Sequence, residues 1–411
     1  MRGVTDSPFS PGSDVVPKIW AGRDQEINDW TRIVRPRRIA GAYERGRTIL
    51  GEPGVGKSSL VNLISREARK QGDWVTDQLR IPPSTDALKR VAKALLTIAD
   101  QAGLSTRTEK SLASLLDRVR SIAVLGVSVS LSHPEGEDAY VALTDLLVEI
   151  GRVAIERNVM VLICIDEIQN ITDEAILSQL LISLGDALTK EVTVSAPGNR
   201  EITRYLPIAV YLSGLPDFER MARSQKGATF TRRFKSTLLS SVTTSEMEQA
   251  LAPLVNQGWE VGDGEGGVKS VYMDQDARDA IIDLSKGEPF LFQLAGDSAW
   301  HAGSTDTITR EDVLAGWQAV RDEAESHVAN ILDRLPEQER LLVEIMGELD
   351  PAERTLSTIA HTAGISPSSK LGTAAQRLDI VRGIIRRGRP YTFHNQAVEA
   401  YLTTEWPRET T

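Results

Sequence analysis

A glycine-rich segment at residues 51–59 (GEPGVGKSS) has the residue types and spacing that suit phosphate binding. It fits the pattern GxxxxGK followed by Ser or Thr, and it lies between a short apolar run and a helical pattern. Glycines allow backbone N–H groups to surround phosphate oxygens, and a helix that begins near Lys57 directs its positive dipole end at them. Lys57 would neutralise the β- and γ-phosphate oxygens, and Ser58 would bind Mg²⁺. We therefore predict an Mg-ATP site that includes Gly51, Glu52, Pro53, Gly54, Val55, Gly56, Lys57, Ser58 and Ser59.

An acidic pair follows the most apolar run of the chain, in the segment 159–170 (VMVLICIDEIQN). Such a run predicts a buried strand, and carboxylates at the carboxyl end of a parallel strand face the ligand crevice. Asp166 would hold Mg²⁺ through water, while Glu167 would orient and deprotonate the attacking water. The alternative is that both are solvated residues at a strand end.

The alternation of apolar and helical segments predicts an α/β base with a parallel sheet. Its strands are expected at 48–50, 74–79, 122–131, 159–165 and 208–212, and its helices at 57–71, 85–102, 138–157 and 173–190. Beyond residue 240 the strand signals mostly stop, and a capping box of Ser245 and Glu248 predicts the start of a helical domain. The expected divisions are a flexible tail at 1–16, the base at 17–240, a helical lid at 241–335 and a third unit at 336–411.

Composition excludes several classes of protein. The chain has 411 residues, of which 41% are hydrophobic and 25% charged, which is ordinary for a globular protein. The run 159–165 falls far short of the roughly 18 residues of a transmembrane helix, and residues 1–13 lack the apolar core of a signal peptide. A cytoplasmic location and no membrane partner are therefore expected. The single cysteine, Cys164, excludes an internal disulfide, and the net charge of −10 means that nucleic acid would need a local basic surface.

The third unit has the pattern of a winged helix. A helix at 336–349 precedes two short helices joined by a turn at Ile365 and then a hairpin, IVRGIIRRGRPYTF. Ser366 is the expected N-cap of the second short helix, with Pro367 at its first position. Six basic residues against one acid between residues 370 and 389 form the strongest nucleic-acid signal, and winged helices also serve as protein interfaces. The residues predicted to contact duplex DNA are Lys370, Arg377, Arg386, Arg387 and Arg389.

With these motifs together, residues 17–405 resemble AAA+ type P-loop ATPases, in the branch that holds origin-recognition initiators, archaeal-type ATPases and STAND switch ATPases. The resemblance implies a P-loop NTPase base with a parallel sheet, a helical lid and a C-terminal winged helix. It also implies slow hydrolysis of ATP to ADP and phosphate, with ATP and Mg²⁺ as cofactors.

Two weaker motifs of the base also resemble the family. Residues 16–24 (VPKIWAGRD) are similar to its adenine-pocket box, which would place Ile19, Trp20 and Gly22 against the base of the nucleotide. An ordinary loop packed on the sheet is the alternative. Residues 208–216 (IAVYLSGLP) resemble the sensor 1 strand, in which Ser213 would hold the γ-phosphate or the attacking water, or would simply end a strand.

Three further residues take expected roles from the resemblance. Arg232, with Arg233 in reserve, would act as a finger toward a neighbouring copy's γ-phosphate, although solvated arginines are common at such positions. In GEPFLFQ, Pro289 would pack on the adenine where most of the family has an arginine, which favours a conformational switch. His394 would reach the β-phosphate as in STAND ATPases, or would cap a surface helix.

Two functions from different classes fit these motifs. The first is an ATPase whose nucleotide state is coupled to DNA binding or assembly through the winged helix. The second is a STAND-like signalling or defence switch whose winged helix binds its own lid or a partner protein. The basic segment favours DNA, whereas the overall acidity, Pro289 and His394 favour the switch.

Overall fold

The computed structural model describes residues 2–12, 15–83, 85–125, 139–196, 200–224, 230–262 and 267–408. The chain forms two compact units. The base unit comprises residues 23–50 and 60–238, and the second unit comprises residues 1–22, 51–59 and 239–411. The phosphate-loop segment therefore belongs to the same unit as the C-terminal half of the chain.

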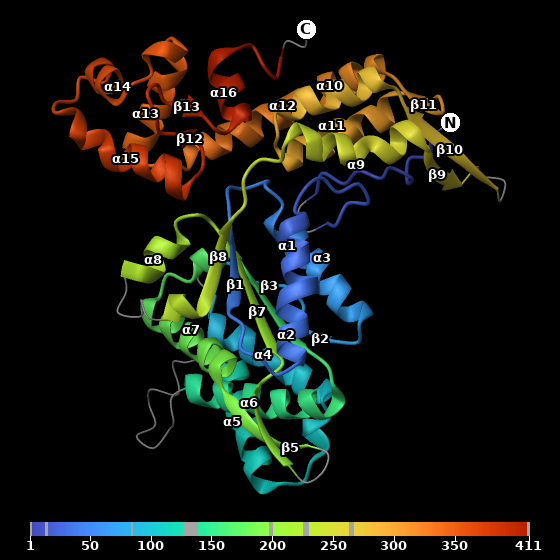
Figure 1. Ribbon diagram of the computed structural model, residues 1–411, viewed down its shortest axis with the longest axis vertical. Helices are drawn as coiled ribbons and strands as arrows, with labels where there is room; N and C mark the ends of the chain where they lie inside the picture. The colour runs from blue at the N-terminus through green and yellow to red at the C-terminus, as the bar shows by residue number, and fades with distance from the viewer. Residues whose placement is uncertain are drawn as a thin grey trace. The chain divides into compact units, whose positions relative to one another are not determined.

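The base unit is built on a parallel sheet whose strands run in the order β2-β4-β7-β1-β8, with β3 also paired to β4 (Figure 1). The strands are β1 (Gly46–Leu50), β2 (Trp74–Val75), β3 (Leu79–Arg80), β4 (Val161–Asp166), β7 (Ile208–Gly214) and β8 (Phe234–Leu238). Every residue of β4 and β7 is buried, as expected of parallel strands covered on both faces. The predicted parallel α/β sheet is confirmed.

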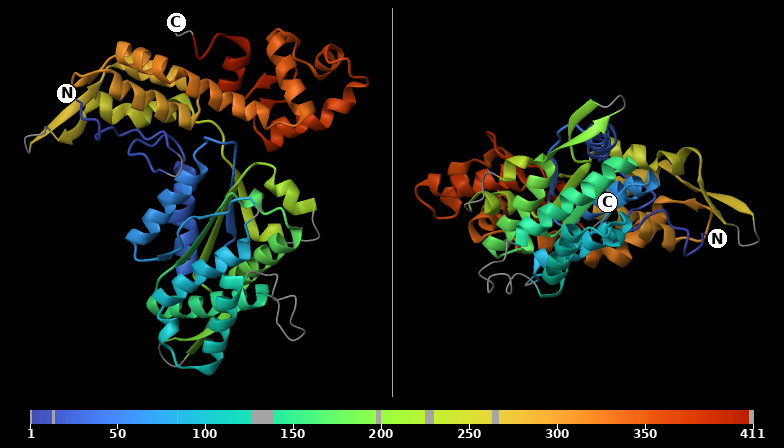
Figure 2. Two further views of the ribbon diagram at one scale, coloured as in Figure 1. Left: turned by 180° about the vertical axis from the view of Figure 1, so that it is seen from behind. Right: turned by 90° about the horizontal axis from the view of Figure 1, so that it is seen from below.

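Helices flank this sheet on either side (Figures 1 and 2). They are α1 (Asp24–Asn28), α2 (Arg35–Ile39), α3 (Lys57–Lys70), α4 (Ala87–Gln101), α5 (Lys110–Leu125), α6 (Ala139–Arg157), α7 (Glu174–Thr189) and α8 (Phe218–Ser224). The helix α4 begins where the Asp86 carboxylate caps the Lys89 N–H, and it buries Leu88, Val91, Leu95 and Ile98 on one face. The sequence predicted α3, α4, α6 and α7, whereas α1, α2, α5 and α8 were not predicted.

Three sequence expectations for the base need correction. A strand was expected at 122–131, but the residues up to Leu125 form the end of α5, so this part of the prediction is wrong. The rest of the expected strand lies outside the described residues. The run at 74–79 holds two short strands, β2 and β3, where one was predicted. An antiparallel hairpin of β5 (Glu191–Ala196) and β6 (Arg200–Tyr205) was not predicted, because its largely polar strands lack a buried apolar face.

The second unit contains a helical lid made of α9 (Thr244–Asn256), α10 (Gln275–Ser285), α11 (Pro289–Ala302) and α12 (Arg310–Asp333). A small sheet of β9 (Trp259–Gly262), β10 (Val268–Met273) and β11 (Thr307–Ile308) accompanies them, which the sequence did not predict. The capping box expected of Ser245 and Glu248 is formed instead by Thr243 and Glu246. Thr243 has the extended backbone that an N-cap requires, whereas Ser245 already lies within the first turn.

The N-terminal segment, predicted as a flexible tail, packs on the lid within this unit. The Arg2 guanidinium is buried and pairs with Asp312 of α12 at 2.7 Å. Phe9 is 2% exposed and meets the ring of Phe292 of α11 edge to face. Isolated apolar residues among Pro, Ser and Gly carry no periodicity, so no sequence pattern predicts that this segment packs on the lid.

The C-terminal part of the second unit is a winged helix (Figures 1 and 2). Its helices are α13 (Glu337–Glu348), α14 (Leu356–Thr362), α15 (Gly372–Gln376) and α16 (Gln396–Thr403), and its wing pairs β12 (Ile385–Arg386) with β13 (Thr392–Phe393). The expected cap at Ser366 is wrong: a 3-10 turn begins at Ser368 with Pro367 at the cap position and no capping side chain. The predicted combination of P-loop base, helical lid and C-terminal winged helix is confirmed.

No helix in the described part of the chain combines the length and the apolar character that crossing a bilayer requires.

Candidate nucleotide-binding and hydrolysis site

The phosphate loop is wrapped around a buried lysine. Lys57 begins α3, and its Nζ donates to the carbonyls of Gly51 at 2.8 Å and Glu52 at 2.9 Å. Gly54 and Gly56 have φ of +85° and +87°, which side chains with a Cβ rarely adopt. The loop therefore has the backbone that the motif requires, with an ammonium group held where phosphate oxygens could replace its carbonyl partners.

In the base unit, three hydrogen bonds fix the orientation of the Asp166 carboxylate. The Ser213 hydroxyl donates to Oδ1 at 2.6 Å, and the Gln78 amide donates to Oδ2 at 2.7 Å. The backbone N–H of Glu167 also donates to Oδ1, at 2.9 Å. Ser213, which was predicted from the sensor 1 motif, thus lies directly beside the predicted magnesium carboxylate.

Glu167 occupies a left-handed backbone conformation, with φ 57° and ψ 40°. Such a conformation is uncommon for a residue with a side chain and is often found at functional sites. The Gln169 amide donates to its carboxylate, and the Gln169 carbonyl oxygen accepts from the N–H of Leu215 at 3.0 Å. Gln169 therefore fixes the position of the predicted general base relative to the end of β7.

The sequence analysis missed Gln78 and Gln169. Gln169 is two residues beyond Glu167, but its contact with the segment after β7 depends on the fold. Gln78 lies 88 positions from Asp166, and the pairing of β3 with β4 brings the two together. No local pattern marks such a contact.

The two candidate finger arginines differ in their surroundings. Arg233 forms an ion pair with Asp186 of α7 and covers Gly185, so it is held within the base unit. Arg232 is exposed. The exposed side chain is the one that a neighbouring molecule could reach, which keeps Arg232 as the better candidate.

The residues predicted to face adenine gather in the second unit. Ile19 is 3% exposed, and its carbonyl accepts from the Gln293 amide of α11 at 2.9 Å. Pro289 is the first residue of α11, Trp20 is half-buried and Gly22 has a φ of +69°. Segments 274 residues apart in the sequence are thus joined by a hydrogen bond.

His327, a residue that the sequence analysis did not single out, packs against the phosphate loop. Its ring lies 4.7 Å from that of Phe290, and a Cβ placed on Gly54 would come within 2.2 Å of His327 Cε1. Its Nε2 is buried and has no hydrogen-bond partner among the described residues. His394, by contrast, is exposed at the end of the wing.

Burial lowers the pKa of His327 to about 4, from an ordinary value of 6.5. The unfolded chain therefore binds a proton more readily at this position, and stability should fall as the pH drops from about 6.5 to about 4. Compared with His327→Leu, the wild type should lose about 3 kcal/mol of unfolding free energy across this window. Urea denaturation at several pH values measures the difference. His361→Leu, at an exposed position, is the matched control and should follow the wild type.

The basic residues of the winged helix divide into two groups. Arg377 and Arg382 turn inward and pair with Glu339 of α13. Lys370, Arg386 and Arg389 are exposed, and Arg387 pairs with Asp379 at 2.9 Å. The surface available to DNA is therefore smaller than the sequence count indicated and is concentrated at the wing.

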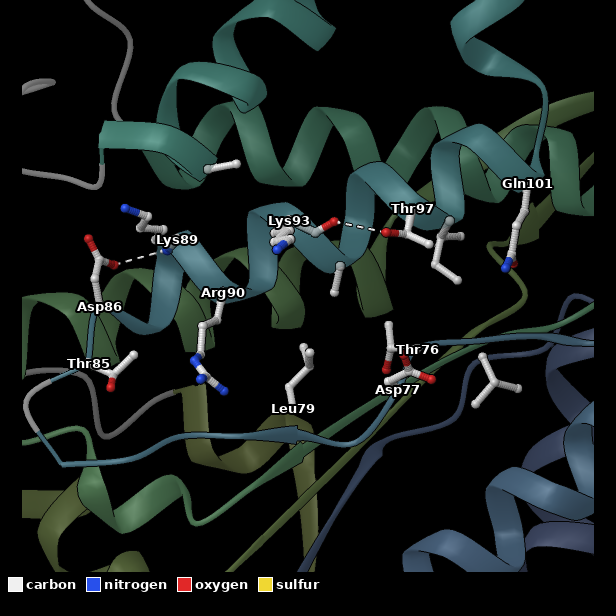
Figure 3. Close-up of a pocket in the computed structure, with 14 residues that line it drawn as sticks. Thr76, Asp77, Leu79, Thr85, Asp86, Lys89, Arg90, Lys93, Thr97 and Gln101 are labelled. Atoms are coloured by element: carbon white, nitrogen blue, oxygen red, sulfur yellow. Dashed lines mark hydrogen bonds between the residues drawn. The ribbon is translucent and has the colours of Figure 1, made fainter.

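A separate groove of about 840 Å³ runs along α4 of the base unit (Figure 3). Lys89, Arg90 and Lys93 line it, but Lys89 donates to the carbonyl of Val124 at 2.7 Å and Arg90 donates to that of Arg80. Two of its cations are therefore already held by the protein. None of the residues predicted to bind nucleotide lines this groove.

The donor set suits a magnesium ion that is only partly held by protein. Within the described residues, no group of three or more His, Cys, Asp or Glu side chains could form a metal cage. Mg²⁺ in nucleotide sites usually takes one or two protein oxygens, together with phosphate and water oxygens. In the base unit, the oriented Asp166 carboxylate is an oxygen donor of this kind.

Comparison with known proteins finds one family model that matches part of the chain. Residues 19–197 match the family described as "AAA ATPase domain". A comparison with curated proteins gave no match.

Solved structures of archaeal ATPases share the fold. The Orc2 protein of Aeropyrum pernix, in its ADPNP–ADP complexes, is 16% identical with a TM-score of 0.55, over 95% of this chain and 96% of that one. The Walker-type ATPase PABY2304 of Pyrococcus abyssi is 14% identical with a TM-score of 0.51, over 91% and 95%. At these identities the likeness establishes the fold alone.

Proposed function

We propose that the chain binds and slowly hydrolyses Mg-ATP, and that its nucleotide state controls DNA binding or assembly through the winged helix. The main support is the ion pair between Glu52 of the phosphate loop and Arg382 of the winged helix, 3.2 Å apart in one compact unit. Through this pair, a change in the loop on nucleotide binding would act on the winged helix. The similar Orc2 protein was solved with ADPNP and ADP, which agrees with a nucleotide-dependent cycle.

The proposed chemistry assigns each residue one task. Residues 51–59 bind the phosphates, with Lys57 neutralising their charge, and Ser58 and Asp166 hold Mg²⁺, which shields the negative charge of the phosphates. Glu167 removes a proton from the attacking water, and Ser213 keeps the Asp166 carboxylate in place. Arg232 of an associated copy stabilises the charge that develops on the γ-phosphate. Ile19, Trp20, Gly22 and Pro289 surround the adenine.

The wing supplies the proposed DNA contact. Changing Arg386, Arg387 and Arg389 to Ala removes exposed positive charge from the hairpin. Because each phosphate contact releases counterions, duplex binding by the triple variant should weaken and depend less on salt. The slope of the logarithm of the binding constant against the logarithm of salt concentration should fall in magnitude by up to about 3. DNA-stimulated ATPase activity should be lost as well. Binding is measured by fluorescence anisotropy at several salt concentrations.

The matched control removes the same charge elsewhere, through Arg66, Lys70 and Lys93 to Ala on exposed faces of α3 and α4. This control should keep the wild-type salt slope. If the wing variant binds DNA as the wild type does, the wing is not the contact. If the wild type does not bind DNA and its ATPase rate does not change when DNA is added, the proposed DNA function is wrong.

A STAND-like switch is the second candidate, and contacts within the second unit favour it. The Asn395 amide of the winged helix donates to Glu288 of the lid at 2.7 Å, in addition to the pair formed by Arg382. A winged helix that binds its own lid and phosphate loop would close over a bound nucleotide. This function requires slow ATP turnover whose rate does not change when DNA is added. It also requires ADP to remain bound through purification.

A further inference from the structure

The phosphate loop contains a buried carboxylate, which is an unfavourable group in a site for polyphosphates. Glu52 is the second residue of the loop and is 5% exposed. Its backbone carbonyl accepts from Lys57, so it lies within the turn that encloses the ammonium group. A negative charge at this position opposes the positive potential that the loop and the helix end provide for phosphates. Water screens a buried charge poorly.

The winged helix supplies the opposite charge. Arg382 NH1 lies 3.2 Å from Glu52 Oε1, and both side chains are 5% exposed. The Nε of Arg382 donates to Glu339, and Glu339 also accepts from Arg377. Glu52 and Glu339 are thus joined to the guanidinium groups of Arg382 and Arg377 in one charged cluster.

We propose that Arg382 is a positioning residue of the nucleotide site, which neutralises Glu52 and so makes the phosphate loop able to accept the phosphates of ATP or ADP. The inference rests on the proposed nucleotide function and deepens it, since it makes the docked winged helix part of the nucleotide site. Without Arg382, the Glu52 carboxylate is less well balanced and repels the phosphates more strongly. With Arg382 in place, that repulsion is cancelled before the ligand arrives.

Thermodynamic linkage adds a consequence for the winged helix. If the docked winged helix favours nucleotide binding, then bound nucleotide must favour the docked winged helix to the same degree. Loss of the nucleotide would therefore make the Glu52–Arg382 ion pair, and with it the docked winged helix, less stable. The ion pair therefore gives a physical route from nucleotide occupancy to the position of the C-terminal part of the chain.

A double-mutant cycle on the full chain tests the proposal. Arg382→Gln should weaken ADP and ATP binding by on the order of 10-fold or more, because the buried Glu52 carboxylate loses the guanidinium that pairs with it. Glu52→Gln combined with Arg382→Gln should recover affinity to within about threefold of the wild type, since the repelling charge is gone. Arg386→Gln, an exposed arginine on the same wing, is the matched control and should bind as the wild type does. Fluorescent ADP and ATP analogues are the probes, and circular dichroism checks folding.

The outcomes separate this inference from the function on which it rests. Nucleotide binding by Arg382→Gln within twofold of the wild type would overturn the proposal, and so would a double variant as weak as Arg382→Gln alone. If Arg382→Gln does not fold, the folded double variant and Glu52→Gln still decide. Only the backbone of residue 52 belongs to the phosphate-binding turn, so both variants must bind nucleotide well. Failure of the wild-type chain to bind ADP or ATP at all would instead refute the proposed nucleotide function.

Discussion

Replacement of Glu167 by Gln is expected to abolish ATP turnover while nucleotide binding is retained. The amide has the shape of the carboxylate and can still accept from Gln169, so the local structure should survive. It cannot take a proton from water, and loss of a general base typically costs about 10²- to 10⁴-fold in rate. Steady-state phosphate release and the binding of a fluorescent ATP analogue measure the two effects separately.

Glu174→Gln provides the control for this experiment, because Glu174 is an exposed carboxylate in the first turn of α7. It should hydrolyse ATP at the wild-type rate. Retained turnover in Glu167→Gln would remove Glu167 from the mechanism. Loss of both binding and turnover would point to a structural effect, and thermal unfolding of the variant would then show a lowered midpoint.

The sequence predicted the parts of this protein that depend on local patterns. The long apolar run of β4, the glycine spacing of the phosphate loop and the periodicity of α4 each lie within some 15 consecutive residues. Both glycine φ values of the loop follow from its motif. The parallel sheet follows from the same signals, although part of α5 was predicted as a strand and β8 was not predicted.

Contacts between distant residues could not be predicted in this way. The cluster of Glu52, Arg382 and Glu339 joins positions up to 330 residues apart, and His327 approaches Gly54 only because α12 packs beside Phe290. The sequence shows that residues 370–389 are basic, but it does not show that Arg377 and Arg382 turn inward to a carboxylate. Which charges are buried is decided by tertiary packing, which a linear charge count does not contain.

The phosphate loop is expected to lose its ligand when Lys57 is changed to Met. Lys57 is 9% exposed, and its Nζ donates to two loop carbonyls, so the ammonium both orders the loop and supplies positive charge for phosphates. Methionine keeps most of the side-chain length and removes the charge. We expect ATP and ADP affinity to fall on the order of 100-fold, and turnover to become undetectable.

Lys70→Met is the control that separates this specific role from a general loss of charge. Lys70 ends the same helix, is exposed, and forms only a 3.5 Å contact with Glu67 among the ion pairs described. Surface pairs of this kind contribute less than about 1 kcal/mol, so Lys70→Met should bind nucleotide as the wild type does. Isothermal titration with ADP compares the two variants. If Lys57→Met bound ADP within threefold of the wild type, residues 51–59 would not be the nucleotide site, because a phosphate loop without its cation cannot offset the charge of a diphosphate.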